Sequence, residues 1–239
     1  MSIDELEALL LVQEHDTARD RLRHRRAALP ERAELETQSA NFRTLDAQAR
    51  EIRGRRDVVL ADEKRLDDEA RSLGARADDG DAKLYSGTVN SPRELQAMQA
   101  DVEMLRRQRS DLEDQELEVM EARELLDAQI MALEADTAVV QADIERLQGV
   151  IVGAESEIDE ELAKEDTARA QQASAVPDAL LADYERRRAQ NKGAGAARLV
   201  GTSCTACHLS IPSTEAENIR KGAGAVVAYC DNCGAILVP

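Results

Sequence analysis

Apolar residues recur along most of the chain at alternating intervals of three and four, which is the spacing of a coiled-coil helix. Between residues 98 and 158, one of the two interleaved heptad series is apolar throughout. Its members are Met98, Leu105, Leu112, Val119, Leu126, Leu133, Val140, Leu147 and Ala154. A shorter stretch with the same register occupies residues 42–77. The pattern therefore predicts two long coiled-coil helices.

The segment between these stretches, "DDGDAKLYSGTVNSPREL", carries both turn residues and the signature of a helix start. Ser91 is placed to cap a helix, Pro92 suits the first helical position, and Glu94 completes a reciprocal capping box. The sequence predicts that the first helix ends near residue 78. The second is expected to begin at residue 91 or 92, which leaves a turn at about residues 79–91.

Charged residues at the second heptad series indicate how the two helices pair. In a parallel homodimer, Arg109 and Glu116 would each face an identical charge in the other chain. Folding the chain back near residue 86 instead places Glu63 near Arg109 and Arg56 near Glu116, so that opposite charges meet. We predict an intramolecular antiparallel hairpin, with a parallel dimer as the alternative.

The expected architecture is mainly α, with a small β module at the C-terminus. Residues 1–175 form the antiparallel coiled-coil hairpin, which Pro30 should kink or interrupt. Residues 176–192 form a short connector helix that opens at Pro177, and residues 193–239 form the terminal module. Its short strands are expected in "ARLV", "AVVAY" and "AILVP".

Composition supports long helices rather than a large globular core. Of the 239 residues, 43% are hydrophobic and 33% are charged, but only 2% are aromatic. No run approaches the roughly 18 to 20 apolar residues that cross a bilayer, and the first residues are acidic where a secretory signal is basic. We therefore expect a cytoplasmic protein without membrane contact, in which paired cysteines serve metal or redox chemistry rather than disulfides.

All four cysteines lie near the C-terminus as two C-x-x-C pairs: Cys204 with Cys207, and Cys230 with Cys233. Such pairs can bring four thiolates to one tetrahedral zinc ion, and Gly234 fits the tight turn after the second pair. Together with the short strands, this predicts a zinc ribbon with one structural Zn²⁺. The alternatives are two disulfides, a mononuclear iron site and a thioredoxin-like C-x-x-C, which would need a βαβ setting.

A complete shell of four thiolates has no open position for water or substrate, so the metal is not expected to catalyse a reaction. His208, directly after Cys207, is interpreted as a turn residue rather than as a ligand. The sequence also contains no Gly-rich phosphate loop and no nucleophile elbow. We expect a protein that is not an enzyme and has no small-molecule substrate.

Charge is distributed unevenly along the chain. The net charge is −17, yet residues 184–239 contain seven basic and four acidic side chains, a local balance of +3. This basic end is the candidate for contact with RNA or DNA phosphates. The candidate residues are Arg186, Arg187, Arg188, Lys192, Arg198, Arg220 and Lys221. Alternatively, Arg186–Arg188 complement the C-terminal dipole of the connector helix.

The segments "LYSGTVNSPRELQAMQADVEML", "YERRRAQNKGAGAARLVGTSCTACHLSIP" and "CDNCGAILV" resemble the bacterial C4-type zinc ribbon proteins, including actinobacterial and mycobacterial members. That resemblance implies zinc on the four cysteines and an adaptor role toward nucleic acid or protein. Some of these relatives have been tied to alternative sigma factors and flagellar transcripts. Ala235 departs from the pattern, since members often carry a basic residue there, which weakens a phosphate contact by the second knuckle.

A second hypothesis is a protein adaptor for transcription machinery, such as a sigma factor, that acts through the hairpin. Leu84, Tyr85 and Val89 in the predicted turn are the candidate partner contacts, because apolar residues at an exposed turn are unusual. The same residues could simply pack the turn closed. A third hypothesis is a purely structural protein, and in each case we expect a monomer or a weak oligomer.

Overall fold

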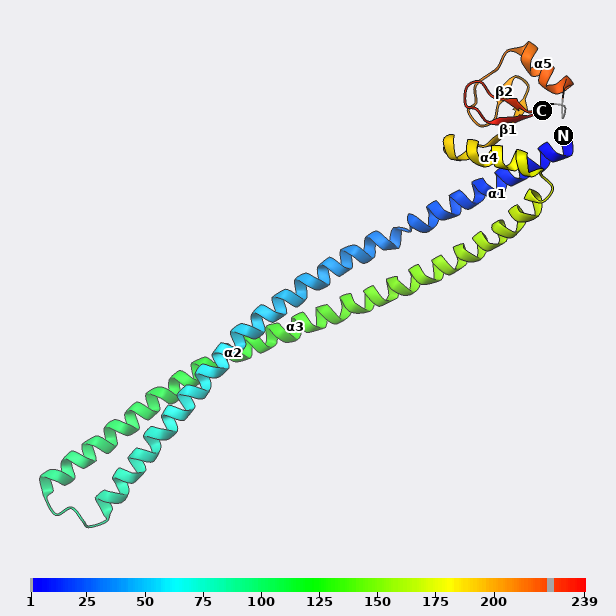
Figure 1. Cartoon of the computed structure of the whole chain (residues 1–239). Coiled ribbons are helices and arrows are strands. Elements are labelled where there is room, and N and C mark those ends of the chain that lie inside the picture. The colour runs from blue at the N-terminus through cyan, green and yellow to red at the C-terminus, as the bar shows by residue number, and fades with distance from the viewer. Residues whose placement is uncertain (1, 223–225) are drawn as a thin grey trace. The chain divides into compact units, whose positions relative to one another are not determined.

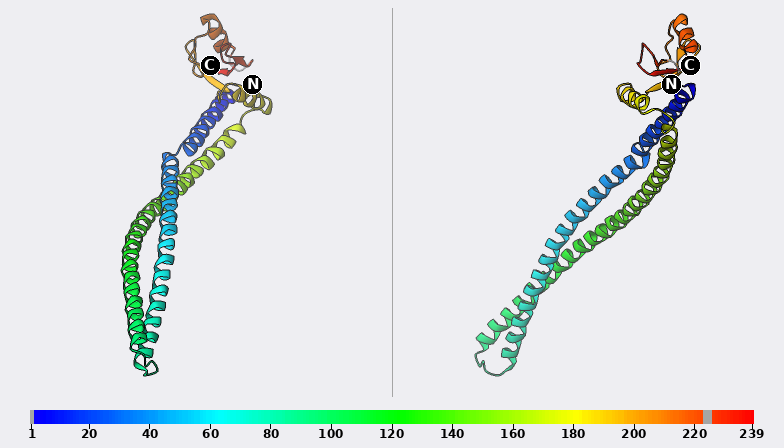
Figure 2. Two further views of the ribbon diagram at one scale, coloured as in Figure 1. Left: turned by 90° about the vertical axis from the view of Figure 1, so that its left-hand side faces the viewer. Right: turned by 45° about the vertical axis from the view of Figure 1, so that its right-hand side comes forward.

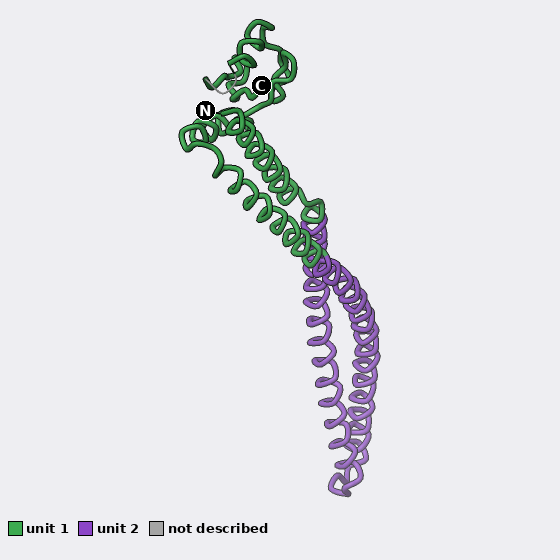
Figure 3. The backbone as a smooth tube through the Cα atoms, turned by 90° about the vertical axis from the view of Figure 1, so that its right-hand side faces the viewer, with its two compact units in different colours: residues 1–33, 147–239 green, residues 34–146 purple. Residues whose placement is uncertain are grey.

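The computed structural model describes residues 2–222 and 226–239, and most of them are helical. The elements are α1 (Ile3–Ala27), α2 (Pro30–Tyr85), α3 (Pro92–Ala173), α4 (Asp178–Gln190), β1 (Ala196–Val200), β2 (Ser203–Cys204), α5 (Ser213–Lys221), β3 (Ala228–Tyr229) and β4 (Ile236–Val238) (Figure 1). They form two compact units, residues 34–146 and residues 1–33 with 147–239 (Figure 3). Within the described residues, no helix combines the length and apolarity that a bilayer crossing requires.

In residues 34–146, α2 and α3 lie side by side and antiparallel, as both views of Figure 2 show. Near the end of the hairpin, Ala77 of α2 packs with Val102 and Leu105 of α3, and Leu73 and Leu84 lie against this cluster. Small and branched apolar side chains thus fill the narrow seam that the heptad pattern predicts. The predicted intramolecular hairpin is confirmed.

The first arm of the hairpin is longer than predicted. Helix α2 continues through "DDGD" to Tyr85 instead of ending near residue 78, so the turn is limited to residues 86–91. Gly80 explains the difference, because a Cβ added there would lie 2.6 Å from a Val102 methyl group. This glycine permits a close approach of two helices and does not mark a helix end. Helix α3 begins at Pro92, as predicted.

The charged layers pair in a different register from the predicted one. Glu63 accepts hydrogen bonds of 2.7 and 2.8 Å from Arg123, not from Arg109, and Arg53 donates a 2.7 Å bond to Glu134. Arg109 instead bonds Glu113 of its own helix at 2.7 Å. Arg123 lies two heptads after Arg109, and both occupy the same heptad series. The error follows from the repeat itself, because a seven-residue period is unchanged by a slip of whole heptads.

Helix α1 begins with a capping box of its own. The Ser2 hydroxyl accepts a 3.2 Å bond from the backbone N–H of Glu5, and the Glu5 carboxylate accepts a 2.6 Å bond from the Ser2 N–H. The helix ends at Ala27, and α2 starts at Pro30. Proline has no N–H to donate to the preceding turn, so the predicted interruption of the first arm falls at residues 28 and 29.

A four-stranded sheet with the order β2-β1-β4-β3 forms the C-terminal module. Strand β1 pairs antiparallel with β2 and parallel with β4, with Ala196 opposite Ile236, and β4 pairs antiparallel with β3. Two of the predicted strands therefore form: β1 begins one residue before the predicted 197–200, and β4 lies within the predicted 235–239. Strand β3 covers only the end of the predicted range 225–229, whose first residue, Ala225, lies outside the described residues.

Strand β4 is buried on both of its faces. Ile236 and Val238 point to one face, where they pack on the apolar N-terminal half of α1 and on Tyr184 of α4. Leu237 points to the other face, into the cluster that contains the cysteines. Successive residues of a strand face opposite sides, so this one short strand joins the helices to the ribbon. The ribbon is thereby held on α1 and α4 (Figure 1).

A buried charged cluster stabilises the packing of α1 on α3 and α4. Asp16 has no solvent exposure and accepts hydrogen bonds from Arg19 at 2.7 Å, Arg169 at 2.8 Å and the Tyr184 hydroxyl at 2.8 Å. The guanidinium of Arg188 lies 3.6 Å away. Burial of Asp16 raises its pKa, but the bonds from Arg169 and Tyr184 outweigh burial and leave the pKa below its usual value. Three helices thus meet at one ionised carboxylate.

Candidate metal centre

The four cysteine sulfurs gather at one point, all within 4.8 Å of one another. The sulfurs of Cys204 and Cys233 are 3.9 Å apart, and those of Cys207 and Cys230 are 3.8 Å apart. A tetrahedron of thiolates with Zn–S bonds of about 2.3 Å has edges of about 3.8 Å. The donor set and its spacing therefore fit one zinc ion, with no position left open for a substrate. This is a structural zinc site.

Two similar turns carry the cysteines. In each turn, the residue after the second cysteine donates its N–H to the carbonyl of the first, His208 to Cys204 at 2.8 Å and Gly234 to Cys230 at 2.7 Å. The N–H of Cys204 also donates to the Leu209 carbonyl at 3.1 Å, and the second turn repeats this bond at 2.9 Å. The local backbone therefore points both pairs of thiols inward.

His208 lies at the position that corresponds to Gly234. Its φ is 60° and that of Gly234 is 74°, so both residues are in the left-handed region. A histidine in this conformation is strained relative to glycine but tolerated better than most residues. Its imidazole is not among the side chains that gather with the sulfurs. The interpretation of His208 as a turn residue agrees with this backbone.

The thiols sit in surroundings that favour different protonation states. Burial raises the pKa of Cys204, and it raises the pKa of Cys233 to about 12. A hydrogen bond from the backbone of Leu209 lowers the pKa of Cys207. Zinc binds the thiolate form, so the ion supplies the charge that ionises the buried thiols, and its binding releases protons.

The connector helix holds two of its three consecutive arginines within the head, the name used here for the unit formed by residues 1–33 and 147–239. Arg187 bonds Asp183 at 2.9 Å and donates to the Gly234 carbonyl at 2.7 Å, which ties α4 to the second zinc turn. Arg188 donates to Asp20 of α1 at 2.5 Å. These two side chains therefore stabilise the packing of α4 against the second zinc turn and α1, whether or not they also contact a ligand.

Other basic residues of the C-terminal end also have partners. Arg198 forms a two-pronged ion pair with Glu7 at 2.8 and 2.5 Å, and this contact lowers the pKa of Glu7. Arg220 donates to a backbone carbonyl, and Lys221 lies 3.2 Å from Glu217. The acidic residues of α1 thus compensate part of the basic charge that the local balance suggests.

Five of the seven predicted contacts are exposed to solvent: Arg186, Lys192, Arg198, Arg220 and Lys221. The Arg186 side chain is exposed but ion-paired with Asp183. Lys192 is exposed and has neither an ion pair nor a side-chain hydrogen bond with any residue that the structure describes. The predicted set is therefore distributed over α4, the segment after it, β1 and α5.

The three predicted partner contacts at the hairpin turn have different surroundings. Leu84 is half-buried against the Val102 and Leu105 cluster, and Val89 is also half-buried. Tyr85 is 88% exposed. Leu84 therefore packs the turn, whereas the tyrosine ring next to it points into solvent.

Sequence reasoning missed two contributors to the head. Gln13 of α1 donates to the Gly193 carbonyl at 2.8 Å and accepts from the Gly195 N–H at 2.7 Å, which fixes the strand entering the ribbon. Helix α5 between the cysteine pairs buries Ala216 in the ribbon core. The run "PSTEAENIRKG" did contain a signal for α5, with an acidic first turn, a basic last turn and a following glycine. Gln13 had no comparable signal.

Comparisons with known proteins agree with this architecture. Residues 12–192 match the CT398-like coiled coil hairpin domain, and residues 203–237 match the C4-type zinc ribbon domain. An uncharacterized protein of Mycobacterium tuberculosis, Rv2229c, is 30% identical over 231 residues, which cover 97% of this chain and 94% of the relative.

Solved structures share the fold over nearly the whole length. A protein from Mycobacterium smegmatis matches with a TM-score of 0.88 at 27% identity, covering 100% of this chain and 98% of that one. CT398 from Chlamydia trachomatis matches with a TM-score of 0.68 at 18% identity, covering 98% and 97% of the two chains. The chain belongs to the family with a CT398-like coiled coil hairpin and a C4-type zinc ribbon.

Proposed function

We propose that this family member is a non-enzymatic adaptor whose hairpin turn binds a partner protein. The observation that carries the proposal is Tyr85, whose side chain is 88% exposed at the end of α2. An aromatic ring held out by a helix offers a large contact area at a low cost in conformational entropy, and tyrosine is enriched among residues that dominate binding energy.

A small cleft beside Tyr85 suits a side chain of the partner. The cleft has a volume of about 280 Å³, and its apolar lining includes Leu84, Leu95 and Val102. Its charged lining includes Asp81 and an arginine that is ion-paired with it. The apolar lining supports a partner that inserts an apolar side chain into the cleft. The net charge of −17 on the whole chain favours a partner that carries basic groups around that side chain.

The zinc site supports an adaptor rather than a catalyst. Four thiolates complete the tetrahedral shell, so the ion stabilises the ribbon and has no coordination position for a reacting group. The ribbon in turn is seated on α1 and α4 through β4. In the proposed role, the head is a folded anchor and the hairpin presents the contact residue.

The test is photo-crosslinking from the proposed contact. A photoreactive phenylalanine analogue is placed at position 85 in the full-length, zinc-loaded protein, and crosslinks are formed in a lysate of the source cells. The matched control places the analogue at Leu125, which is 68% exposed on α3. We expect a protein adduct from position 85 that is absent from position 125.

The crosslinked protein is then purified and its affinity measured with the Tyr85→Ser and Leu125→Ser variants. Loss of a tyrosine that dominates an interface costs about 2 kcal/mol, or roughly 30-fold in Kd. Leu125→Ser should bind as the unchanged chain does. Equal adducts from both positions, or equal affinity of the two variants, would contradict a contact at the hairpin turn.

A second candidate function, nucleic-acid binding by the head, is supported by the exposure of Arg186, Lys192 and Lys221. These three side chains are the ones to replace with glutamine, because replacing Arg187 or Arg188 would also remove bonds that hold the head together. Binding to labelled RNA and duplex DNA should weaken with added salt, and less steeply in the triple variant. Unchanged binding in this variant would rule out these three side chains as the contact.

A further inference from the structure

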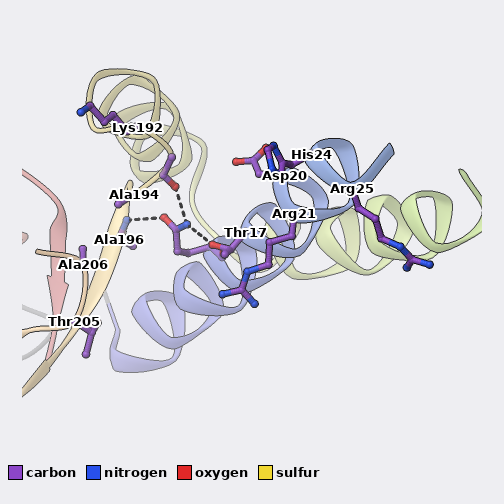
Figure 4. A pocket seen from close by; sticks show the side chains of 12 residues that line it. Thr17, Asp20, Arg21, His24, Arg25, Lys192, Ala194, Ala196, Thr205 and Ala206 are labelled. Atoms are coloured by element: carbon purple, nitrogen blue, oxygen red, sulfur yellow. Dashed lines mark hydrogen bonds between the residues drawn. The ribbon is translucent and has the colours of Figure 1, made fainter. Parts of the chain in front are cut away.

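A cleft in the head lies beside the ribbon and is separate from the zinc site. Its volume is about 620 Å³, within the range of about 300 to 1,000 Å³ that is usual for small-molecule sites. Helix α1 forms one wall, the segment that follows α4 forms a second, and Thr205 and Ala206 of the first zinc turn form a third (Figure 4). All three walls belong to the same compact unit.

The cleft has an uncharged side lined by small residues. Gly193, Ala194, Ala196 and Ala206 contribute to its lining. Gly193 has a φ of 100°, a conformation that a larger residue would adopt only with strain, so this part of the wall stays free of side chains. The amide of Gln13 bonds the backbone on this side, as the dashed lines of Figure 4 show, which holds the wall in place.

The lining also contains positively charged side chains. Arg21 extends from α1, and Lys192 extends from the segment that follows α4 (Figure 4). Neither forms an ion pair or a side-chain hydrogen bond with any residue in the described ranges 2–222 and 226–239. Other exposed arginines of the head do have acidic partners, as Arg198 has in Glu7. Two unpaired cations on separate walls of one cleft indicate an anionic ligand.

The one carboxylate in the lining is already neutralised. Asp20 accepts a 2.5 Å bond from Arg188 and a 3.4 Å bond from Arg23. Arg25 adds a further positive charge to the lining, although it lies 3.6 Å from Glu161. The balance in the cleft is therefore positive, within a chain that is strongly acidic as a whole.

We propose that this cleft binds a nucleotide, with Arg21 and Lys192 on the phosphate groups and the small uncharged wall against the base. Guanidinium and ammonium groups bind phosphate oxygens through charge-assisted hydrogen bonds. A wall of glycine and alanine lets a flat ring approach the backbone closely. The cleft is larger than an isolated phosphate needs, and both halves of a nucleotide find a matching surface in it.

The test is calorimetric titration of the full-length, zinc-loaded protein with ADP at low ionic strength. Parallel titrations use pyrophosphate, adenosine and a short single-stranded RNA. We expect saturable binding of one ADP per chain, weaker binding of pyrophosphate and no binding of adenosine. Arg21→Gln and Lys192→Gln should each weaken ADP binding at least about tenfold, because each removes a charge-assisted contact.

Matched control variants separate a defined site from general attraction to positive charge. Lys164→Gln and Lys221→Gln each replace an exposed lysine of the head, on α3 and α5, that lies outside the lining. Both should bind ADP as the unchanged chain does, with zinc content and helicity equal in all variants. Absence of ADP binding at millimolar concentration overturns the proposal. Equal weakening by the control variants does so as well, and binding of RNA alone would assign the cleft to a polymer instead.

Discussion

Replacing Asp16 with alanine should loosen the head without affecting residues 34–146. Asp16 is fully buried and accepts three hydrogen bonds, from Arg19, Arg169 and Tyr184. The variant leaves the guanidinium groups and the tyrosine hydroxyl without their acceptor inside the protein. Because these groups connect α1 to α3 and α4, the damage should spread through the packing of the head.

The size of the effect follows from how little solvent reaches the cluster. The side chains of Arg19 and Arg169 are 18% and 19% exposed, so water can replace only part of the lost interaction. Removing one partner of a buried ion pair costs about 3 to 5 kcal/mol. Tyr184→Phe removes one charge-assisted hydrogen bond and should cost about 1.5 to 3 kcal/mol.

Hydrogen exchange read by mass spectrometry is the appropriate assay, because it resolves the head from the rest of the chain. Amides of α4 should exchange roughly 150-fold to 5,000-fold faster in Asp16→Ala, the factor that 3 to 5 kcal/mol corresponds to. Amides of residues 50–70 should keep their rates. Less than a fivefold change in α4 would refute the reasoning that this carboxylate holds the helices together.

Acidity should reproduce part of this effect. The pKa of Asp16 is lowered in the folded protein, so its stabilising contribution is present above the unfolded value of about 3.9 and is lost as the pH falls through the folded value. The stability difference between the unchanged chain and Asp16→Asn should therefore be constant from about pH 5 to pH 8. It should narrow below about pH 4, and a difference that persists there would contradict the assignment.

Three further predictions concern the hairpin, the glycines and the zinc turn. Glu63→Arg should lower the unfolding free energy of the hairpin by about 1 kcal/mol, because its ion pair with Arg123 is only partly exposed. Adding Arg123→Glu should restore the unfolding free energy. A double variant that is no more stable than the single one in chemical denaturation would argue against the observed register. Gly195→Ala should lower the unfolding free energy by more than about 2 kcal/mol, because the added Cβ would lie 2.5 Å from a buried tyrosine ring. Gly54→Ala places its Cβ in open space and should raise the unfolding free energy by about 1 kcal/mol. Thermal melts of both variants measure the difference. His208→Gly should retain one zinc per chain by elemental analysis and unfold no more easily, because glycine relieves the positive φ; loss of the metal would identify the imidazole as a ligand.

Local patterns were sufficient for the two long helices of the hairpin and for the metal. The heptad series predicted two long helices, because the burial of one stripe requires that period whatever the helices pack against. Two C-x-x-C pairs predicted the zinc ligands, because the spacing within each pair is set by the turn itself. Pro30 and Pro92 marked helix boundaries for an equally local reason, the missing N–H and the fixed φ of proline.

The tertiary structure decided the features that depend on which distant segments meet. The heptad repeat could not choose between Arg109 and Arg123 as the partner of Glu63, because whole-heptad slips preserve the pattern. Gly80 could signal a helix end or a close helix contact until its neighbour was known.

The head shows the same division most clearly. Its basic residues formed a cluster in the sequence, but α1 brings acidic partners from the other end of the chain, and Glu7 neutralises Arg198. The same packing leaves Arg21 and Lys192 unpaired within the described part of the chain, on separate walls of a cleft that no segment forms alone. The sequence by itself determined the long helices and the four zinc ligands, because their signals lie within a few residues or one period. Only the tertiary structure decided which charges are neutralised and which stay open to a ligand, because electrostatic pairing depends on distance in space.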